Sequence, residues 1–473
     1  MSSGTFLIMR HELLLIVAAL SVLIAEIFWD PSKKKSISLF SIILLGIITI
    51  IGFIPSPEGA LFGGMYISSG ARLIMKNILN IGALLVFIQS VTWLNKEENS
   101  EKISEYFLLL ISTLVGMNFM LSAGHFLIFY IGIELATIPI AALAAYDRYK
   151  NKSAEAGIKL ILTSALSSGI LLYGLSMIYG TTGTLYFSEV AAHFGNTSLQ
   201  ILAFIFFFAG MAFKISIVPF HLWTADVYEG SPVNITSYLS VISKGAALFI
   251  LMIILFVVFP VILVTWQKTI FVTSVLTMTI GNLFAIRQKN LKRFLAFSSI
   301  SQAGYILLGV IGGNQLGMAS VIYYILVYIF SNLGAFGVVA AISNATGKES
   351  IDEYNGLYHT NPKLSLVMTL ALFSLAGIPP VAGFFGKFFL FTAAAQKGFY
   401  ALVLIAVLNT IISLYYYLLV VKAMFIIKSD TPIEHFKSDF STRFALGICI
   451  AGIVVTGFAS IIFEVIRNLS FGI

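Results

Sequence analysis

Cysteine, charge and nucleotide-binding motifs are all scarce in this sequence. The single cysteine, Cys449, leaves no pair for a disulfide and no ligand set for a cysteine-bound iron–sulfur cluster. Neither G-x-G-x-x-G nor G-x-x-x-x-G-K-[ST] occurs, so neither a dinucleotide site nor an ATP site is indicated. We therefore expect no redox centre in the chain, and any energy input has to come from an ion gradient or from another subunit.

What the sequence has in abundance is apolar residues. Hydrophobic residues make up 59% of the 473 residues and charged residues only 10%, with a mean hydropathy of +0.97. This composition predicts an all-α polytopic membrane protein, because a helix needs about 20 apolar residues to cross the bilayer. About fourteen such runs occur. They are expected at 12–29, 37–54, 74–94, 104–122, 125–145, 157–180, 199–222, 233–259, 269–287, 294–313, 318–343, 363–393, 401–427 and 443–467.

The net charge of +7 indicates a membrane topology rather than nucleic-acid binding, because the basic residues are unevenly distributed between loops. When loops are assigned alternately to two sides, one side holds 17 basic residues: Lys33 to Lys35, Lys96, Lys102, Arg148, Lys150, Lys152, Arg287, Lys289, Lys292, Arg293, Lys348, Lys363, Lys428, Lys437 and Arg443. The other side holds six: Arg10, Arg72, Lys76, Lys268, Lys397 and Arg467. The positive-inside rule places the first side in the cytoplasm, and an even helix count then places both termini outside.

Two of the apolar runs are interrupted by proline. The seventh contains Pro219, and the twelfth contains Pro379 and Pro380. Because a proline inside a helix frees the carbonyl four residues earlier, three carbonyls are expected to be free: those of Ile215, Leu375 and Ala376. A membrane tolerates such groups only against protein or water.

Broken helices five positions apart in the helix order predict two inverted repeats with a site at each break. The repeats are expected to be helices 4–8 and helices 9–13. The corresponding divisions are residues 1–100 for three N-terminal transmembrane helices, 101–260 for the first five-helix repeat, 261–428 for the second, and 429–473 for a C-terminal transmembrane helix.

Four ionisable residues lie within stretches that otherwise have the composition of lipid-spanning helices: Glu134, Lys214, Lys244 and Lys387. A charge at bilayer depth costs at least about 2.5 kcal/mol, so it usually marks an ion or proton path. Pro139 follows Glu134 by five residues, just as Pro219 follows Lys214 by five. Each of these charges therefore has a freed carbonyl, and hence a point of hydration, close by.

Such groups pass protons if their proton affinity can be adjusted. If Glu134 pairs with Lys214, opening the pair releases a proton toward Lys244 and then toward Lys387. Structural roles are the alternatives: Glu134 pins two helices, Lys214 extends to an interface, or Lys387 caps the carbonyls freed at the break.

Other polar residues near the breaks are supporting candidates. Lys159 lies near a helix end and is either interfacial or inward-facing. His221 directly follows the seventh-helix break, and it either relays protons or lies at the membrane interface. Asp226 and Glu229 either take part in the path or form a solvated turn. The histidines show no metal-ligand spacing.

Several segments carry a recognisable pattern: Gly132 to Leu135, Phe213 to Thr224, Asp226 to Pro232, Ser240 to Lys244, Phe297 to Tyr305, Leu375 to Pro380 and Gly383 to Phe388. Together they resemble the antiporter-like membrane subunits of respiratory complex I, the proton-translocating NADH:quinone oxidoreductase. The resemblance covers residues 100 to 425, and Asp-Val-Tyr-Glu-Gly is its most specific part. Within the family, the likeness is greatest to the group called subunit N in bacteria and subunit 2 in mitochondria.

The resemblance implies fourteen helices with both termini outside. It also implies that Glu134 pairs with Lys214, that Lys244 connects the two halves, and that Lys387 leads to the outlet. A lysine at position 387 argues against subunit M, and the chain end at Ile473 without a long lateral helix argues against subunit L. Gln302 stands where relatives often carry histidine, so a central relay there would need water or Tyr305.

As a complex I subunit, the chain would belong to a translocase and would hold no cofactor itself. NADH, FMN, iron–sulfur clusters and quinone are expected in partner subunits, and other membrane subunits, including neighbouring antiporter-like ones, are expected beside it in a bacterial cytoplasmic membrane. The alternative is a subunit of a multisubunit sodium/proton antiporter, a family that shares the fold and these lysines. A third interpretation is a membrane-arm scaffold that only holds its neighbours.

Overall fold

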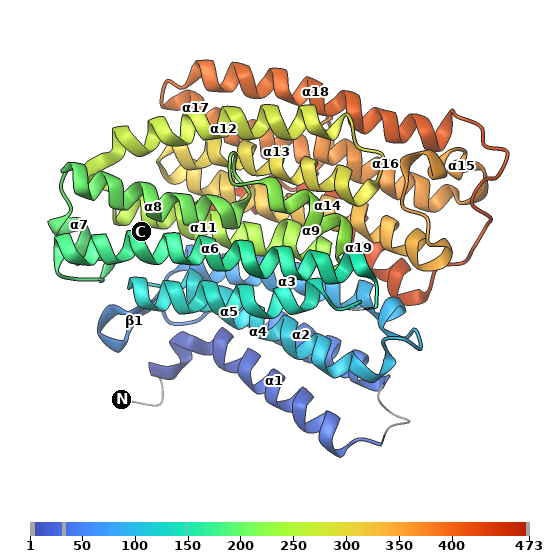
Figure 1. Ribbon diagram of the computed structural model, residues 1–473, viewed down its shortest axis with the longest axis horizontal. Coiled ribbons are helices and arrows are strands. Elements are labelled where there is room, and N and C mark those ends of the chain that lie inside the picture. Colours follow the sequence, from blue (N-terminus) through green and yellow to red (C-terminus); the bar gives the residue numbers. More distant parts are fainter. Residues whose placement is uncertain (1–4, 31–34, 148, 470–473) are drawn as a thin grey trace.

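Long helices lie side by side in the computed structural model, which describes residues 5–30, 35–147 and 149–469 (Figure 1). Lys33, Lys34 and Arg148, which contribute to the charge asymmetry, lie outside the described residues, and so does Ile473. The polytopic all-helical membrane fold is confirmed.

The N-terminal part contains a short hairpin as well as the expected helices. Its elements are η1 (Thr5–Met9), α1 (Arg10–Phe28), α2 (Ser36–Gly52), β1 (Gly59–Leu61), η3 (Phe62–Gly64), β2 (Tyr66–Ser68) and α3 (Gly70–Leu94). The antiparallel β1–β2 hairpin occupies the stretch expected to be polar loop. Helix α3 begins four residues earlier than expected, so Arg72 and Lys76 are buried helix residues. Counting them as loop charges was wrong.

The next part holds the first interrupted helix. Its elements are η4 (Ser100–Lys102), α4 (Ile103–Leu121), α5 (Phe126–Ala144), α6 (Asn151–Thr182), α7 (Phe187–His193), α8 (Ser198–Ile215), α9 (Leu222–Gly230), α10 (Val233–Tyr238), the π-helical turn η5 (Leu239–Ser243) and α11 (Lys244–Val257). Helix α5 runs on past Pro139 without a break.

The remaining part holds the second interrupted helix. Its elements are η6 (Pro260–Ile262), α12 (Leu263–Ala285), α13 (Leu291–Gly312), α14 (Gln315–Thr346), η7 (Ile351–Tyr354), α15 (Leu357–Thr360), α16 (Pro362–Ala376), α17 (Ala382–Gln396), α18 (Tyr400–Phe425), α19 (Phe440–Phe458) and α20 (Ser460–Leu469).

Within the described residues, 12 helical stretches are long and apolar enough to cross a membrane. Helices α2 and α16 are apolar but shorter. The count of fourteen, the two inverted repeats and the four residue divisions therefore stay predictions.

The two breaks have the same local geometry. Ser216 directly follows α8 and Gly377 directly follows α16, and both have a left-handed backbone, at φ 65° and φ 85°. In each case the next amide bonds a carbonyl five residues back, Ile217 to Ala212 at 2.9 Å and Ile378 to Phe373 at 3.1 Å. This is the hydrogen-bond pattern of a Schellman cap. The chain thus leaves both helices in the same way, and the prolines lie in the connecting segments.

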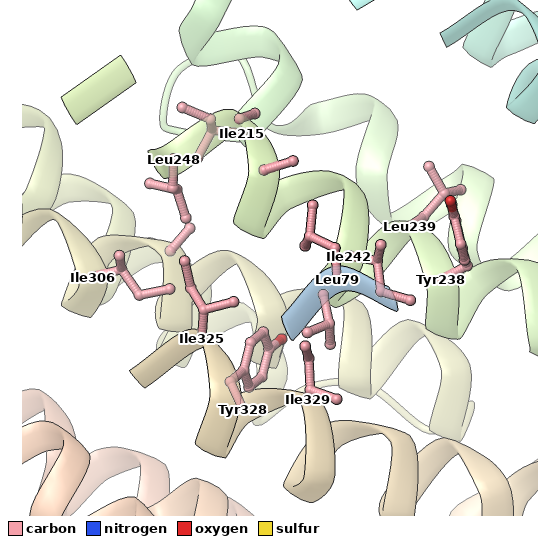
Figure 2. Packing of buried hydrophobic residues seen from close by; sticks show 14 of the residues in the cluster. Leu79, Ile215, Tyr238, Leu239, Ile242, Leu248, Ile306, Ile325, Tyr328 and Ile329 are labelled. Carbon is pink, nitrogen blue, oxygen red and sulfur yellow. The ribbon is translucent and has the colours of Figure 1, made fainter. Parts of the chain in front are cut away.

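Helices α13 and α14 form the centre of the bundle. Nearly all of their residues are buried, whereas α6 and α18 expose leucine and isoleucine along one face, as Leu166 and Ile411 illustrate. Figure 2 shows the central packing, in which Leu79 of α3 lies near Ile242 of η5 and Ile329 of α14. The exposed apolar faces suit contact with lipid or with other membrane subunits.

The two described ends of the chain lie at the same end of the bundle. The first residue of α3, Gly70, lies against Leu469, the last residue of α20. His11, in the first turn of α1, bonds Asn77 in the second turn of α3 at 2.9 Å. We call this the terminal end, and the other end of the bundle the opposite end.

Candidate functional site

Glu134 on α5 and Lys214 on α8 lie close together, but among the described residues they do not form an ion pair. Lys214 Nζ instead donates to Thr137 Oγ1 at 2.5 Å, one helical turn beyond Glu134. Glu134 Oε1 is buried and has no hydrogen-bond partner within the described part of the chain. The direct pair expected from the sequence therefore stays a prediction.

The end of α8 provides a favourable site for the Lys214 ammonium. Lys214 lies in the last turn of α8, where the helix dipole favours a positive charge. The nearby Phe213 carbonyl accepts a hydrogen bond from Trp223 Nε1 at 3.1 Å. Thr224 also donates to Ser216 Oγ at 2.7 Å, which holds the left-handed turn in place. The break is thus a defined structure and not a frayed end.

Lys244 lies at the centre of the bundle and is almost completely buried. It is 3% exposed and begins α11, directly after the π-helical turn η5. Its Nζ donates to Ser299 Oγ of α13 at 2.6 Å and lies 5.2 Å from the centre of the Tyr228 ring. Single π-helical turns often occur at functional sites. Lys244 is therefore held by groups from both halves of the chain.

Gln302 on α13 joins the central helices to the second break. Its Nε2 donates to the Leu375 carbonyl at 3.0 Å and to Tyr417 Oη at 3.3 Å. Its Oε1 accepts a hydrogen bond from Tyr324 of α14. Tyr417 is in turn bonded to Ser298 Oγ at 2.5 Å. The Leu375 carbonyl is one of the groups that the sequence predicts to be free, and the Gln302 amide occupies it.

Lys387 reaches back across the second break. Its Nζ donates to the Ala376 carbonyl at 3.0 Å and lies 4.5 Å from the centre of the Tyr305 ring. The side chain is 3% exposed. Lys387 thus caps the Ala376 carbonyl, which is the structural role considered for it from the sequence. Capping does not exclude proton transfer, because an ammonium donor that can change partner can also release a proton.

The other supporting residues lie apart from this line. Lys159 is 40% exposed and forms ion pairs at 2.7 Å with Glu155 and with Asp226, so its ammonium is not in the buried centre of the bundle. His221 is buried, and its Nδ1 has no hydrogen-bond partner among the described residues. Tyr305 accepts a bond from Asn282 at 3.3 Å and does not bond Gln302.

Asp226 and Glu229 form a charged network at the opposite end of the bundle. Arg293 Nη1 bonds Asp226 at 2.7 Å and Glu229 at 3.1 Å. Lys152 adds a contact to Glu229 at 3.2 Å. The network joins α6, α9 and α13, so these two acids do more than form a solvated turn.

The hydroxyl groups of the site were not singled out from the sequence. They are Thr137, Tyr228, Ser298, Ser299, Tyr324 and Tyr417. The only available signal was the helical spacing of Ser298, Gln302 and Tyr305, which places polar groups on nearby faces of α13. Within the described residues, hydrogen bonds do not connect Lys214 to Lys244, nor Ser299 to Gln302. Those two steps need movement or water.

Comparison with known proteins places this arrangement in a family. A family model described as "NADH:quinone oxidoreductase/Mrp antiporter, TM" matches residues 123–413. NADH-quinone oxidoreductase subunit N of Phocaeicola vulgatus is 54% identical over 461 residues, covering 97% of this chain and 98% of the relative. Subunit N of Azobacteroides pseudotrichonymphae is 50% identical over 477 residues, covering 100% and 99%. The chain belongs to the subunit N family of NADH-quinone oxidoreductases.

Solved structures agree with this family membership. A chain of respiratory complex I from Thermus thermophilus superposes with a TM-score of 0.80 at 27% identity, covering 96% of this chain and 98% of that one. A chain of the Mrp complex from Dietzia sp. DQ12-45-1b gives 0.85 at 20% identity, covering 99% and 97%, which shows the shared fold alone. The resemblance to complex I subunit N is confirmed. The chain is a membrane subunit of that translocase, and the comparisons favour complex I over the Mrp antiporter.

Cofactor chemistry belongs to other subunits of the subunit N family's complex. Within the described residues, no group of three or more histidine, cysteine, aspartate or glutamate side chains is arranged to hold a metal ion. The buried lysines donate to hydroxyl and carbonyl oxygens.

Proposed function

We propose that this chain transfers protons across a bacterial cytoplasmic membrane, with Glu134, Lys214, Lys244 and Lys387 as the relay. The observation that carries the proposal is the burial of Lys244 and Lys387, each 3% exposed and each hydrogen-bonded to a neutral oxygen. A buried ammonium with no carboxylate partner is costly, so a lysine held in this way can lose its proton.

Each lysine has a distinct position along the path. Lys214 takes up a proton beside Thr137 and Glu134, and Lys244 receives it between the two halves of the chain. Lys387 carries it past the second break toward the outlet. Gln302 connects α13 to the second break through hydrogen bonds. It does not carry the proton itself, because an amide does not exchange protons at neutral pH. The step past Gln302 passes through water or through Tyr324 and Tyr417.

The orientation proposed here puts the terminal end of the bundle on the periplasmic side. The loops of the opposite end carry the excess of lysine and arginine, which favours the cytoplasm. The driving force comes from quinone reduction in partner subunits, which hold the NADH, FMN, iron–sulfur and quinone sites. Neighbouring antiporter-like subunits contact the exposed apolar faces.

The test compares single substitutions in the intact complex reconstituted into vesicles. Lys214→Ala, Lys244→Ala and Lys387→Ala are compared with Lys397→Ala, a control at an exposed lysine. Assembly, NADH-driven electron transfer and the number of protons moved per electron are measured for each. The expected result is normal assembly with a lowered proton-to-electron ratio in the first three variants and an unchanged ratio in the control.

Three outcomes contradict the proposal. An unchanged proton-to-electron ratio in assembled Lys214→Ala and Lys244→Ala complexes excludes the relay. Lost assembly with normal pumping by the remaining complex favours a scaffold role. Sodium-dependent proton exchange without an electron donor would favour the antiporter alternative.

A further inference from the structure

A second buried charge cluster lies outside both interrupted helices. Lys76 Nζ of α3 is 2.6 Å from Glu12 Oε1 of α1, and both side chains are completely buried. Tyr66 of β2 closes the group, because its hydroxyl donates to Glu12 Oε2 at 2.9 Å and accepts from Lys76 at 2.9 Å. These three side chains form a closed hydrogen-bonded ring, which we call the Glu12–Lys76–Tyr66 triad.

Packing alone is a weak explanation for this triad. Removing two charges from water costs several kcal/mol per ion, and a well-packed apolar pair is often as stable as a buried ion pair. Intramembrane ion pairs are commonly parts of ion or proton paths. The triad also contains both a base and an acid, so a proton can move from Lys76 to Glu12 and leave two neutral groups.

Tyr66 favours such a transfer by staying protonated. Burial and the nearby Glu12 carboxylate raise the pKa of the Tyr66 phenol above its ordinary range. The phenol therefore keeps its hydrogen bond to Glu12 in either state of the pair. It orients the carboxyl group without competing for the proton.

A cavity of about 440 Å³ at the terminal end is lined by residues close in sequence to Tyr66 and Lys76. Its lining includes Ile67, Ser69 and Arg72. Ile67 follows Tyr66 directly in β2, and Arg72 lies one helical turn before Lys76 on α3. The Arg72 guanidinium is held by the Ile67 and Ala123 carbonyls at 3.1 and 3.2 Å. The triad side chains are not part of this lining, and the link between the cavity and the triad runs through the neighbouring residues Ile67 and Arg72.

Polar groups also continue inward from the triad. Asn80 lies four residues after Lys76, on the same side of α3. Both Asn80 and Asn118 of α4 are completely buried, and neither atom of either side-chain amide has a hydrogen-bond partner among the described residues. Buried amides of this kind are usually satisfied by internal water. They provide points of hydration between the triad and the centre of the bundle.

An apolar layer separates the triad from the central lysine. Leu79, Ile242 and Ile329 are completely buried and lie close together between α3, η5 and α14 (Figure 2). Gly82 lets α3 approach this layer closely, since an added Cβ would lie 3.0 Å from Ile242. A dry layer blocks free proton flow, so exchange between Lys244 and the triad requires the layer to become hydrated.

We propose that the Glu12–Lys76–Tyr66 triad is a proton-release site on the terminal side of the membrane, which discharges through the 440 Å³ cavity beside Arg72. The inference rests on the proposed function. In one cycle Lys76 gives its proton to Glu12, Glu12 releases a proton to cavity water, and Lys76 takes one proton from the inner side. One proton enters and one leaves, so the triad returns to its ionised state.

The first test removes both charges together, because a single substitution would leave an unpaired buried ion. Glu12→Gln with Lys76→Gln is measured beside Lys214→Ala in the reconstituted complex. The expected result is normal assembly and electron transfer, with the proton-to-electron ratio lowered to that of Lys214→Ala. A normal ratio in the assembled double variant, with a lowered ratio in Lys214→Ala, overturns the release site alone. A normal ratio in Lys214→Ala overturns the proposed function instead.

The second test does not depend on the double variant folding. Ser69→Cys places a thiol in the cavity, and Ser198→Cys places one on an exposed helix start at the same end of the bundle. Complexes are treated with a membrane-impermeant methanethiosulfonate reagent, with the unsubstituted complex as background. Loss of pumping with electron transfer retained, in Ser69→Cys only, supports the outlet. Equal pumping before and after labelling in a fully labelled Ser69→Cys complex overturns it.

Discussion

Lys387 Nζ lies 3.0 Å from the carbonyl oxygen of Ala376, on the other side of the break between α16 and α17. The two residues are eleven positions apart in the sequence, and the non-helical segment between α16 and α17 lies between them. The same ammonium lies over the Tyr305 ring at 4.5 Å. Lys387 belongs to α17 and its ammonium bonds the last carbonyl of α16. The geometry of the break therefore determines where this charge lies.

This contact predicts different effects of Lys387→Met and Lys387→Arg. Methionine leaves the Ala376 carbonyl without its donor, which should destabilise the complex by about 1 to 3 kcal/mol and stop proton transfer at this position. Arginine keeps a donor but does not deprotonate in a protein, so stability should be nearly retained while proton transfer is lost. Thermal unfolding and the proton-to-electron ratio separate these effects. Normal pumping by Lys387→Arg would show that Lys387 acts only as a cap.

Gly383 lies at a close contact between α16 and α17, and a larger residue there should separate the two helices. A Cβ at Gly383 would lie 1.7 Å from the Ser374 carbonyl oxygen, which is backbone and has little freedom to move. Gly383→Ala should therefore destabilise the assembled complex by about 3 kcal/mol. Gly447→Ala in α19 is the matched control, because nothing lies within 4 Å of its added Cβ. The thermal midpoints should fall for the first variant and stay equal or rise slightly for the second.

The interrupted helices could be predicted from the sequence because proline acts locally. A proline has no amide hydrogen and disfavours a continuous helix, so the positions of Pro219, Pro379 and Pro380 were enough to predict the two breaks. The structure adds what receives the freed groups. The Leu375 carbonyl bonds Gln302 from α13, and no local rule relates positions that far apart.

The Glu12–Lys76 pair shows why some site residues could not be predicted. The expected start of α3 was four residues too late, which left Lys76 close to an apparent loop. Hydropathy does not locate the ends of a helix to the nearest residue, because a polar first turn has the same composition as a polar loop. Only the burial of both side chains reveals the pair.

The hydrogen bonds of Gln302 predict which side chains at this position support proton transfer between Lys244 and Lys387. Gln302→Leu removes the donor to the Leu375 carbonyl and the acceptor for Tyr324, so the proton-to-electron ratio should fall and stability should drop by about 1 to 3 kcal/mol. Gln302→His keeps a donor and an acceptor and adds a group that exchanges protons. Pumping by Gln302→His should equal or exceed that of the unsubstituted complex. Equal pumping by Gln302→Leu would show that the path avoids this residue.

The charged network at the opposite end predicts a loss of stability that does not depend on pH near neutrality. Burial alone would raise the pKa of the Asp226 carboxyl. Hydrogen bonds from Lys159 and Arg293 outweigh this effect, so the pKa lies below its ordinary value of 3.8. A lowered pKa in the folded state stabilises the protein above the ordinary value, and this stabilisation is lost only as the pH falls through the lowered pKa. Asp226 is 38% exposed, so Asp226→Asn should cost only about 0.5 to 1 kcal/mol.

This cost should be the same across neutral pH, because Asp226 stays ionised from about pH 6 to pH 8. Thermal midpoints of the Asp226→Asn and unsubstituted complexes, measured at both ends of that range, should differ by a constant amount. Lys150→Ala is the control, since Lys150 contacts Asp147 outside this network and its side chain is 66% exposed. A difference that disappears toward pH 6 would mean that Asp226 already gains a proton there, so Lys159 and Arg293 would not be holding it ionised.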